Sequence, residues 1–529
     1  MLKTIRHPLR TLLLHVEAVF DRAFGPHWNP IRQLGTLAFF LFWVCAVSGI
    51  YVFILFETTV AGAFASVEYM TREQWYLGGI MRSLHRYSSD AMVVVMVLHM
   101  GREFVLDRYR GARWFSWLIG VPTIWFLYMS GISGYWLVWD QLAQYVAIAS
   151  MEWLDWLGIF GEPVATNFLT PDSLSDRFFS LLVFIHIFVP LFLLFTMWIH
   201  VLRVTQPKIN PPRGLAAGTL VMLVALSLVW PAVSHEPADL AVVPASLNLD
   251  WFYLPFYPLF DAWGGRTLWG LAVGVSVLLA AMPWLPPLRR SKAARVALDK
   301  CNGCRRCFAD CPFGAITMEA RSDSLPFEQE AVVDTDACAR CGICVGACPV
   351  STPFQRAGGL VTAIDLPDFA LGHVRDLTER GLRALASEPA DGGRRVMVFG
   401  CDHGARVGDL EQSGVAVVSL PCIGMLPPSF IDYALSRGAA DGVVITGCRD
   451  GGCYQRFGVR WTQERLEGMR DPYLRSRVPR QRIRTLWAAP TDAAKLEEEV
   501  QTFRFWLRGL EDDHSPPPPE AALAPESVE

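Results

Sequence analysis

The chain has 529 residues, of which 52% are hydrophobic and 19% are charged, and its mean hydropathy is positive at +0.28. That length exceeds a single domain, and that apolar content excludes a wholly water-soluble protein. The formal net charge of −4 averages an apolar first half with a polar second half, so it indicates no particular partner. No nucleic-acid partner is expected.

The first predicted element is an amphipathic helix within residues 1–30. Apolar side chains between Leu9 and Phe20 fall on one face of this helix, which is typical of a helix that lies in the membrane interface. Because the stretch is not continuously apolar, we expect no cleavable signal peptide here.

Six apolar stretches are long enough, or nearly so, to cross the hydrocarbon core of a bilayer. They cover residues 33–56, 80–104, 114–138, 178–203, 215–233 and 266–285. Basic residues gather in the loops on one side of these stretches, and acidic residues gather in the loops on the other. The positive-inside rule therefore predicts six spans with both chain ends in the cytoplasm, in the inner membrane of a bacterium or archaeon.

Histidines recur fourteen positions apart in two of these stretches, as His85 and His99 and again as His186 and His200. Fourteen residues are close to four helical turns, so both histidines of a pair share one helix face, about 21 Å apart along the axis. One buried histidine could simply bond to a neighbouring helix, but four at equal intervals indicate ligands. We predict a four-helix bundle in residues 31–210 with two b haems, the outer one on His85 and His186 and the inner one on His99 and His200.

Glycines repeat the same interval in the neighbouring stretches, as Gly35 and Gly49 and as Gly120 and Gly134. A glycine leaves bare backbone against which a flat ring can lie. These four glycines are therefore predicted to pack against the two haems.

Arginines one helical turn from a histidine have two interpretations. Arg82 precedes His85 by three residues and could pair with haem propionates, and Arg177 at the start of the fourth stretch shares this interpretation. For Arg102 and Arg203, anchoring by the positive-inside rule explains their position equally well.

Cysteines divide the chain, because only Cys45, interpreted as a small core residue, lies in the apolar half, and the other twelve follow residue 300. On the reducing side of a membrane structural disulfides are rare, so these twelve are candidate ligands. Eight of them form two C-x2-C-x2-C-x3-C-P runs within residues 291–355.

The duplicated run is the signature of a two-cluster ferredoxin, in which the fourth cysteine of each run joins the first three of the other. It predicts a 4Fe-4S cluster on Cys301, Cys304, Cys307 and Cys348 and a second on Cys338, Cys341, Cys344 and Cys311. Zinc also takes four soft ligands, but it requires neither the crowded third cysteine nor the trailing proline.

The last four cysteines, Cys401, Cys422, Cys448 and Cys453, lie within residues 384–510, where strand and helix patterns alternate. Strand patterns at 396–399, 415–420 and 442–446 each end at or beside a cysteine, and ligands at the carboxyl ends of parallel strands meet at one sheet edge. Four thiolates there suit a 2Fe-2S cluster. Zinc, or a thiol–disulfide pair of Cys448 and Cys453, remains an alternative.

The expected fold is a mainly α membrane protein with six transmembrane helices, followed by an α+β ferredoxin domain and an α/β iron–sulfur domain. Residues 211–290 hold the last two spans, residues 356–383 indicate a linker, and residues 511–529 are rich in proline and acid and are expected to be disordered. A helix pattern covers 374–386. The sequence has no phosphate-binding glycine loop, so we expect neither NAD nor flavin on this chain.

Residues 30–285 resemble the cytochrome b of quinol-oxidising bc complexes, whose matching histidines ligate two b haems and whose matching glycines pack against them. Residues 134–141, GYWLVWDQ, are similar to the family's G-Y-x-L-P-W-x-Q run, which leads into a short interfacial helix beside the quinol pocket. Val138 stands in place of the family's proline. The resemblance also leaves open a dimer formed through this part.

Residues 250–257, DWFYLPFY, resemble the family's P-E-W-Y stretch and its continuation, but the carboxylate of Asp250 is one methylene shorter and the tyrosine hydroxyl is displaced or lost. Quinol oxidation releases protons, so Asp250 is the predicted proton acceptor, with Tyr135 and Tyr253 lining the same cleft. The alternatives are a solvated interfacial aspartate and an interfacial aromatic belt.

Residues 384–500 resemble the delta subunit of methyl-viologen-reducing hydrogenase. The resemblance rests on FGC at 399–401, LPC at 420–422, GC at 447–448 and GGCY at 451–454. In that family these four cysteines bind a 2Fe-2S cluster. The resemblance implies a soluble flavin, hydrogenase, formate dehydrogenase or heterodisulfide reductase-like subunit as partner.

Together these parts predict a membrane subunit of a quinone/quinol oxidoreductase. It would pass electrons between the quinone pool in the lipid and a cytoplasmic redox partner through two b haems, two 4Fe-4S clusters and one 2Fe-2S cluster. The alternative is a non-catalytic haem-containing anchor and electron-transfer adaptor. The sequence indicates neither the quinone species nor the direction of electron flow.

Overall fold

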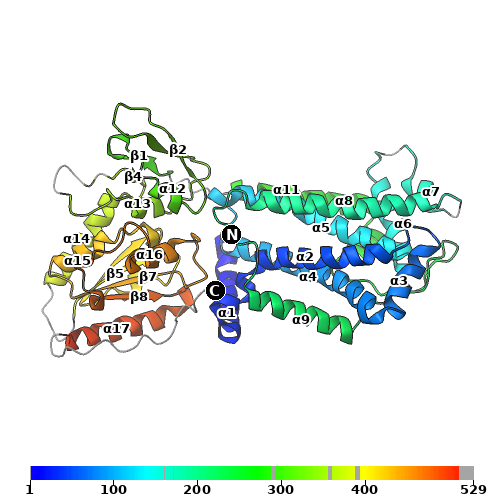
Figure 1. Cartoon of the computed structure of the whole chain (residues 1–529), viewed down its shortest axis with the longest axis horizontal. Coiled ribbons are helices and arrows are strands. Elements are labelled where there is room, and N and C mark those ends of the chain that lie inside the picture. The colour runs from blue at the N-terminus through cyan, green and yellow to red at the C-terminus, as the bar shows by residue number, and fades with distance from the viewer. Residues whose placement is uncertain are drawn as a thin grey trace. The chain divides into compact units, whose positions relative to one another are not determined.

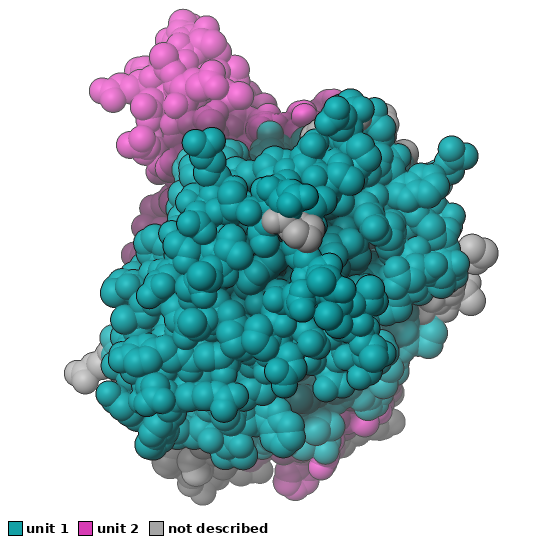
Figure 2. Space-filling view, turned by 90° about the vertical axis from the view of Figure 1, so that its right-hand side faces the viewer, with its two compact units in different colours: residues 1–288 teal, residues 289–529 magenta. Residues whose placement is uncertain are grey.

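The computed structural model describes residues 2–159, 161–170, 172–286, 292–355, 360, 362–387 and 394–510. The chain forms two compact units, Met1–Leu288 and Arg289–Glu529, coloured separately in Figure 2. The predicted disorder of residues 511–529 lies outside the described residues.

The first unit consists of helices. They are α1 (Leu2–Trp28), α2 (Leu34–Leu55), α3 (Gly62–Arg72), α4 (Ile80–Val105), α5 (Trp114–Val138), α6 (Gln141–Asp155), α7 (Val164–Phe168), α8 (Asp176–Val201), α9 (Arg213–Val229), α10 (Phe256–Trp263) and α11 (Gly265–Ala281). The long helices run along one another, with α2 packed on α4 and α5 packed on α8 (Figure 1). Helices α3, α6 and α7 lie at one end of this bundle, and α1 crosses the other end (Figure 1).

Among the described residues, four helical segments are long and apolar enough to cross a membrane, namely Leu34–Leu55, Gly111–Val138, Asp176–Val201 and Gly265–Trp284. Helix α9 is apolar but has only 17 residues. Helix α4 is long enough with 26 residues, but charged side chains on it lower its mean hydropathy. Four spans are thus supported by length and composition, and the predicted six remain a proposal for α4 and α9.

Helix α1 is the predicted amphipathic helix. Leu12 on its apolar face is 62% exposed, whereas Glu17 on the opposite face is 4% exposed. The Glu17 carboxylate pairs with Arg102 at the end of α4, 2.9 Å away. This contact holds α1 against the end of the bundle and leaves its apolar side chains free to enter a membrane interface.

The second unit begins with the ferredoxin part. It contains β1 (Arg295–Val296), α12 (Arg306–Asp310), β2 (Ile316–Ala320), β3 (Gln329–Val333), α13 (Ile343–Ala347) and β4 (Ile364–Asp365). Strands β1 and β4 pair antiparallel, and so do β2 and β3. Each short helix carries the third cysteine of one run, so the two runs have equivalent local structures.

The rest of the second unit is an α/β fold. It contains α14 (Leu371–Ser387), β5 (Val396–Cys401), β6 (Val415–Leu420), the 3-10 turn η7 (Ile423–Met425), α15 (Ser429–Ser436), β7 (Gly442–Gly447), α16 (Gly458–Glu467), β8 (Ile483–Trp487) and α17 (Ala493–Gly509). The strands form one parallel sheet in the order β6-β5-β7-β8. The three predicted strands and the predicted helix at 374–386 are present, whereas β8, which is only half-buried, was not predicted.

Successive side chains of β5 point alternately into two different hydrophobic cores of this fold. Met397 and Phe399 belong to the core that includes α14 and the ferredoxin part, whereas Val396 and Val398 belong to the core beneath α17. The sheet is therefore covered on both faces, as parallel sheets usually are. The ferredoxin part and the α/β fold share one continuous core.

Candidate cofactor sites

The predicted haem ligands meet in two pairs. The ring centroids of His85 and His186 are 6.1 Å apart, and those of His99 and His200 are 6.4 Å apart. Bonds between a metal and an imidazole nitrogen are about 2 Å long, so two rings that bind one metal from opposite sides have centroids about 6 Å apart. Both pairs therefore have the spacing that bis-histidine ligation of an iron requires.

Each predicted glycine lies against the imidazole on the neighbouring helix. A Cβ atom added to Gly49 would lie 2.7 Å from Cε1 of His85, and one added to Gly134 would lie 2.9 Å from Cε1 of His186. At Gly35 and Gly120 the corresponding distances, to His99 and His200, are 3.5 Å. The glycines thus make room for the ligand rings, more tightly at one pair than at the other; their contact with a haem remains a prediction.

Groups on the neighbouring helices orient two of the histidines. Nδ1 of His85 donates to the carbonyl oxygen of Cys45 at 2.8 Å, and Nδ1 of His186 lies 3.1 Å from the hydroxyl of Ser133. With Nδ1 engaged, Nε2 remains for a metal, which is the usual arrangement around a ligating histidine. From the sequence, Cys45 was interpreted only as a core residue, and no pattern pointed to Ser133.

The two arginines predicted to pair with propionates differ. The guanidinium of Arg82 contacts Thr71 and Ser234 and lies 3.6 Å from the carboxylate of Glu68. Arg177 is exposed at the start of α8. Protein groups already surround Arg82, so its role at a propionate remains a prediction, as does that of Arg177.

The three predicted quinone-site residues lie together. The Asp250 carboxylate accepts hydrogen bonds from the hydroxyl of Tyr135 and from the backbone N–H of Tyr253, the latter at 3.0 Å. Its side chain is 3% exposed, so it is buried rather than solvated. The Tyr253 ring packs 6.3 Å from that of Tyr135, and its hydroxyl lies 2.7 Å from that of Ser89.

An arginine that the sequence analysis missed completes this group. Arg86 pairs with Asp250 through Nη2 and with Asp90 through Nε, the latter at 3.0 Å. Asp90 is 7% exposed, and among the described residues its Oδ1 has no hydrogen-bond donor. Opposite charges four residues apart inside an apolar stretch are the signal that could have identified this pair.

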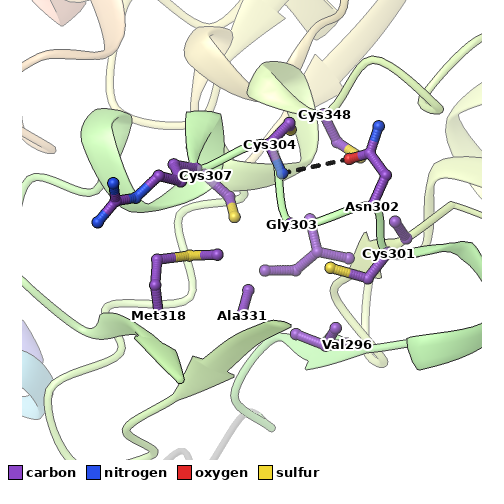
Figure 3. A pocket seen from close by; sticks show the side chains of 12 residues that line it. Val296, Cys301, Asn302, Gly303, Cys304, Cys307, Met318, Ala331 and Cys348 are labelled. Carbon is purple, nitrogen blue, oxygen red and sulfur yellow. Dashed lines mark hydrogen bonds between the residues drawn. The ribbon is translucent and has the colours of Figure 1, made fainter. Parts of the chain in front are cut away.

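The four cysteines predicted for one 4Fe-4S cluster line a single pocket, shown in Figure 3. They are Cys301, Cys304, Cys307 and Cys348, called the first ferredoxin site. Val296, Met318, Ala331, Ala363 and Ile364 contribute its apolar lining. The fourth cysteine of one run thus lies beside the first three of the other.

The loops between the cysteines fit an iron–sulfur cluster. Gly303 and Arg340, at equivalent positions of the two runs, have φ values of 66° and 58°, and Arg305 and Gly342 have 64° and 76°. Left-handed residues alternating with right-handed ones turn successive backbone N–H groups to one side, which forms the concave anion-binding loops found at iron–sulfur sites.

The second ferredoxin site consists of Cys311, Cys338, Cys341 and Cys344. Burial raises the pKa of the Cys341 thiol to about 12, with the nearby thiols of Cys311 and Cys338 adding to this effect. A thiolate in such an apolar place needs a compensating positive charge, which iron supplies. The backbone N–H of Ala315 donates to the sulfur of Cys311 at 3.3 Å, the kind of contact that tunes cluster potentials.

The last four cysteines, Cys401, Cys422, Cys448 and Cys453, also converge and are called the adaptor site. The sulfurs of Cys401 and Cys448 are 3.8 Å apart, and hydrogen bonds from Cys422 and Cys448 hold the pKa of the Cys453 thiol well below its usual value. The backbone N–H of Tyr454 points at the Cys448 sulfur, 3.5 Å away. The carboxyl ends of β5, β6 and β7 position three of the four, as predicted for an open α/β sheet.

Three family models match separate parts of the chain. They are cytochrome b/b6/petB over residues 19–207, the 4Fe-4S dicluster domain over residues 300–352 and the methyl-viologen-reducing hydrogenase delta subunit over residues 400–510. The cytochrome b6 of Tupiella akineta is 30% identical over 208 residues, which cover 94% of that protein and 38% of this chain. The chain belongs to the cytochrome b family.

The cytochrome b6 of Porphyra purpurea is 28% identical over 207 residues, with 94% of that protein and 38% of this chain covered. A solved chain of a hyperthermophilic respiratory Complex III aligns with a TM-score of 0.40 and 19% identity over 51% of this chain and 80% of that chain, too slight a likeness to support an argument. The predicted fusion of a cytochrome b, a dicluster ferredoxin and a delta-subunit-like domain is confirmed. Family membership implies haem b and iron–sulfur clusters in a membrane electron-transfer subunit.

Proposed function

We propose that the chain is a quinone/quinol oxidoreductase subunit that passes electrons between the quinone pool and a cytoplasmic redox partner. The cofactors of this proposal are two b haems, two 4Fe-4S clusters and one 2Fe-2S cluster, each of which accepts and releases single electrons when bound. The six spans, the inner membrane, the cytoplasmic chain ends and a soluble flavin, hydrogenase, formate dehydrogenase or heterodisulfide reductase-like partner belong to the same proposal.

The observation that carries this proposal is the pair of histidine contacts at two levels of one bundle. His85 with His186 and His99 with His200 have the ring separations of axial ligands, 6.1 and 6.4 Å. Two such levels about 21 Å apart along the helices span most of a bilayer of about 30 Å. An electron carrier at each level would connect the two membrane faces.

Proton transfer is assigned to the carboxylates that share Arg86. Quinol oxidation needs a proton acceptor inside an otherwise apolar cleft. Asp250 is oriented by Arg86, Tyr135 and backbone N–H groups, which hold its carboxylate in place. Asp90, on the other side of Arg86, keeps one carboxylate oxygen with no donor among the described residues and could take the proton onward.

A second function has one observation in its favour. Donors surround the Asp250 carboxylate on both oxygens. Both oxygens are thus engaged by donors of the protein itself rather than open to a quinol hydroxyl, which favours a haem-containing membrane anchor that hands quinone chemistry to another subunit.

Anaerobic addition of decylubiquinol to the purified full chain separates these functions. We expect the b-haem absorbance to show reduction by the quinol and Asp250→Asn to slow it, whereas Glu152→Gln, which changes an exposed carboxylate on α6, leaves the rate unchanged. A chain that contains two haems by pyridine haemochrome but is not reduced by quinol refutes the oxidoreductase and supports the anchor.

A further inference from the structure

Residues of two predicted cluster sites pack together in the interior of the second unit. Cys341 of the second ferredoxin site and Cys422 of the adaptor site belong to one buried apolar cluster with Ile343, Phe457 and Trp461. Cys341 is 8% exposed and Cys422 is 1% exposed. The two ligand loops therefore meet in the interior of the second unit, where water is excluded.

The backbone segments next to these ligands pack without intervening side chains. Helix α13, which carries Cys344, lies on the 3-10 turn η7 that follows Cys422. A Cβ atom added to Gly346 on α13 would collide with the carbonyl oxygen of Gly424 in η7, and one added to Gly424 would lie 3.0 Å from Cγ1 of Ile343. The glycines thus allow the two segments to pack closely.

A buried arginine joins the same two loops. Arg465 on α16 is 0% exposed, and its Nη1 donates to the carbonyl oxygen of Gly424 at 2.8 Å. Its Nη2 pairs with Asp310, which is 3% exposed and directly precedes Cys311 of the second ferredoxin site. Removing one partner of such a buried pair would leave the other charge buried without compensation, so the pair fixes the separation of the loops.

Among the described residues, Arg465 reaches the first ferredoxin site only through Asp310, three residues after Cys307 on α12, and no residue of the adaptor lines that site's cavity. Every residue that lines its cavity lies between Val296 and Ile364, and Cys304 is exposed. The first ferredoxin site is therefore the more remote of the two ferredoxin sites from the adaptor site.

We propose that the cluster on Cys311, Cys338, Cys341 and Cys344 exchanges electrons directly with the cluster on the adaptor cysteines, while the cluster on the first ferredoxin site reaches the adaptor only through it. One electron moves in each exchange, so one cluster is oxidised by one charge and the other reduced by one, and no bond or proton is transferred. The inference rests on the cluster assignment within the proposed function, but not on quinone chemistry.

Electron paramagnetic resonance of the fully reduced full chain tests this order, with Cys338→Ser and Cys301→Ser as matched variants, because each replaces the first cysteine of a run and both side chains are 8% exposed. We expect magnetic splitting and fast relaxation of the 2Fe-2S signal in the unmodified chain and in Cys301→Ser, and their loss in Cys338→Ser. Splitting that persists in Cys338→Ser, vanishes in Cys301→Ser or never occurs overturns the order. Because no quinol is involved, this outcome is independent of whether quinol reduces the haems.

Arg465→Met provides a second test in a chain that keeps all twelve ligands, should a cysteine variant fail to fold. Loss of the buried positive charge makes reduction less favourable at both adjoining sites, so their midpoint potentials should fall while that of the first ferredoxin site stays constant. Arg460→Met on the same helix is the control, since its side chain is 61% exposed. Equal shifts at all three clusters, or a shift at the first ferredoxin site alone, contradict the order.

Discussion

Replacing Gly49 by alanine should displace a haem ligand, whereas the same change at Gly35 should not. A Cβ atom at position 49 would lie 2.7 Å from Cε1 and 2.9 Å from Nδ1 of His85. Ordinary carbon contacts are about 3.5 Å or longer, so the ring must retreat by about 0.8 Å. At Gly35 the nearest atom of His99 is already 3.5 Å from the added Cβ, and no movement is needed.

The difference in stability between Gly49→Ala and Gly35→Ala reports only the steric contact between the added methyl group and the histidine ring. Alanine is favoured over glycine inside a helix by about 1 kcal/mol, and this gain is common to both variants. Overpacking costs about 1–3 kcal/mol, so Gly49→Ala should be less stable than Gly35→Ala by that amount. If the whole strain fell on the bond between His85 and iron, affinity for the outer haem would fall about 5-fold to 150-fold.

Haem content per chain, measured as pyridine haemochrome, and the redox titration of the b band are the assays. We expect both haems in Gly35→Ala and loss or altered titration of one in Gly49→Ala. Gly134→Ala and Gly120→Ala repeat the comparison at His186 and His200, with added-Cβ distances of 2.9 and 3.5 Å. Equal haem loss in the members of each pair would refute the reasoning.

Three further predictions follow from the contacts. Burial raises the pKa of Glu68, but hydrogen bonds from Arg72 and Ser234 and the charge of Arg82 outweigh burial and lower this pKa below its usual 4.5. Glu68→Gln should therefore lower the melting temperature at neutral pH by a difference that shrinks as the pH falls below 4.5 and through the lowered pKa, and a difference that stays constant as the pH falls contradicts this. Cys348→Ser should alter the cluster signal of the first ferredoxin site and Cys311→Ser that of the second, and the reverse assignment would show that each run binds its own cluster. Arg86→Met leaves two buried carboxylates unpaired, so stopped-flow reduction of the haems by quinol should slow by about tenfold or more at unchanged haem content; an unchanged rate excludes this arginine from proton transfer.

Periodic patterns made much of this molecule predictable from the sequence. A helical repeat of 3.6 residues places His85 and His99 on one helix face, independently of the surrounding residues. Because each pair lies in a long apolar segment, the histidines are expected inside a bundle of membrane helices. Strands of a parallel sheet are short apolar runs, so the positions of Cys401 and Cys448 at strand ends could be read directly. The ferredoxin runs are local in sequence, and their loop conformation follows from the cysteine spacing.

Contacts between residues that are far apart in the sequence produce no periodic pattern from which they could be predicted. Arg86 and Asp250 are 164 positions apart, and nothing near Asp250 indicates which cation will face it. Asp310 and Arg465 are 155 positions apart, so the junction between two cluster sites was not predicted. Strand β8 was missed because it is only half-buried and carries Arg484 within its short run, which weakens the apolar signal.

In the proposed orientation, the separation of the two histidine levels sets how strongly the membrane potential acts on electron flow. About 21 Å of a hydrocarbon core about 30 Å thick carries about 0.7 of the potential in a uniform field. A full crossing is worth about 2.3 kcal/mol per charge at 100 mV, so one electron that passes between the levels gains or loses about 1.6 kcal/mol, or about fifteenfold in equilibrium constant. With the cytoplasm negative, the potential opposes inward transfer and favours transfer from the cytoplasmic clusters to an outer quinone. Inward flow from quinol to these clusters therefore requires a driving force that exceeds this amount for each electron.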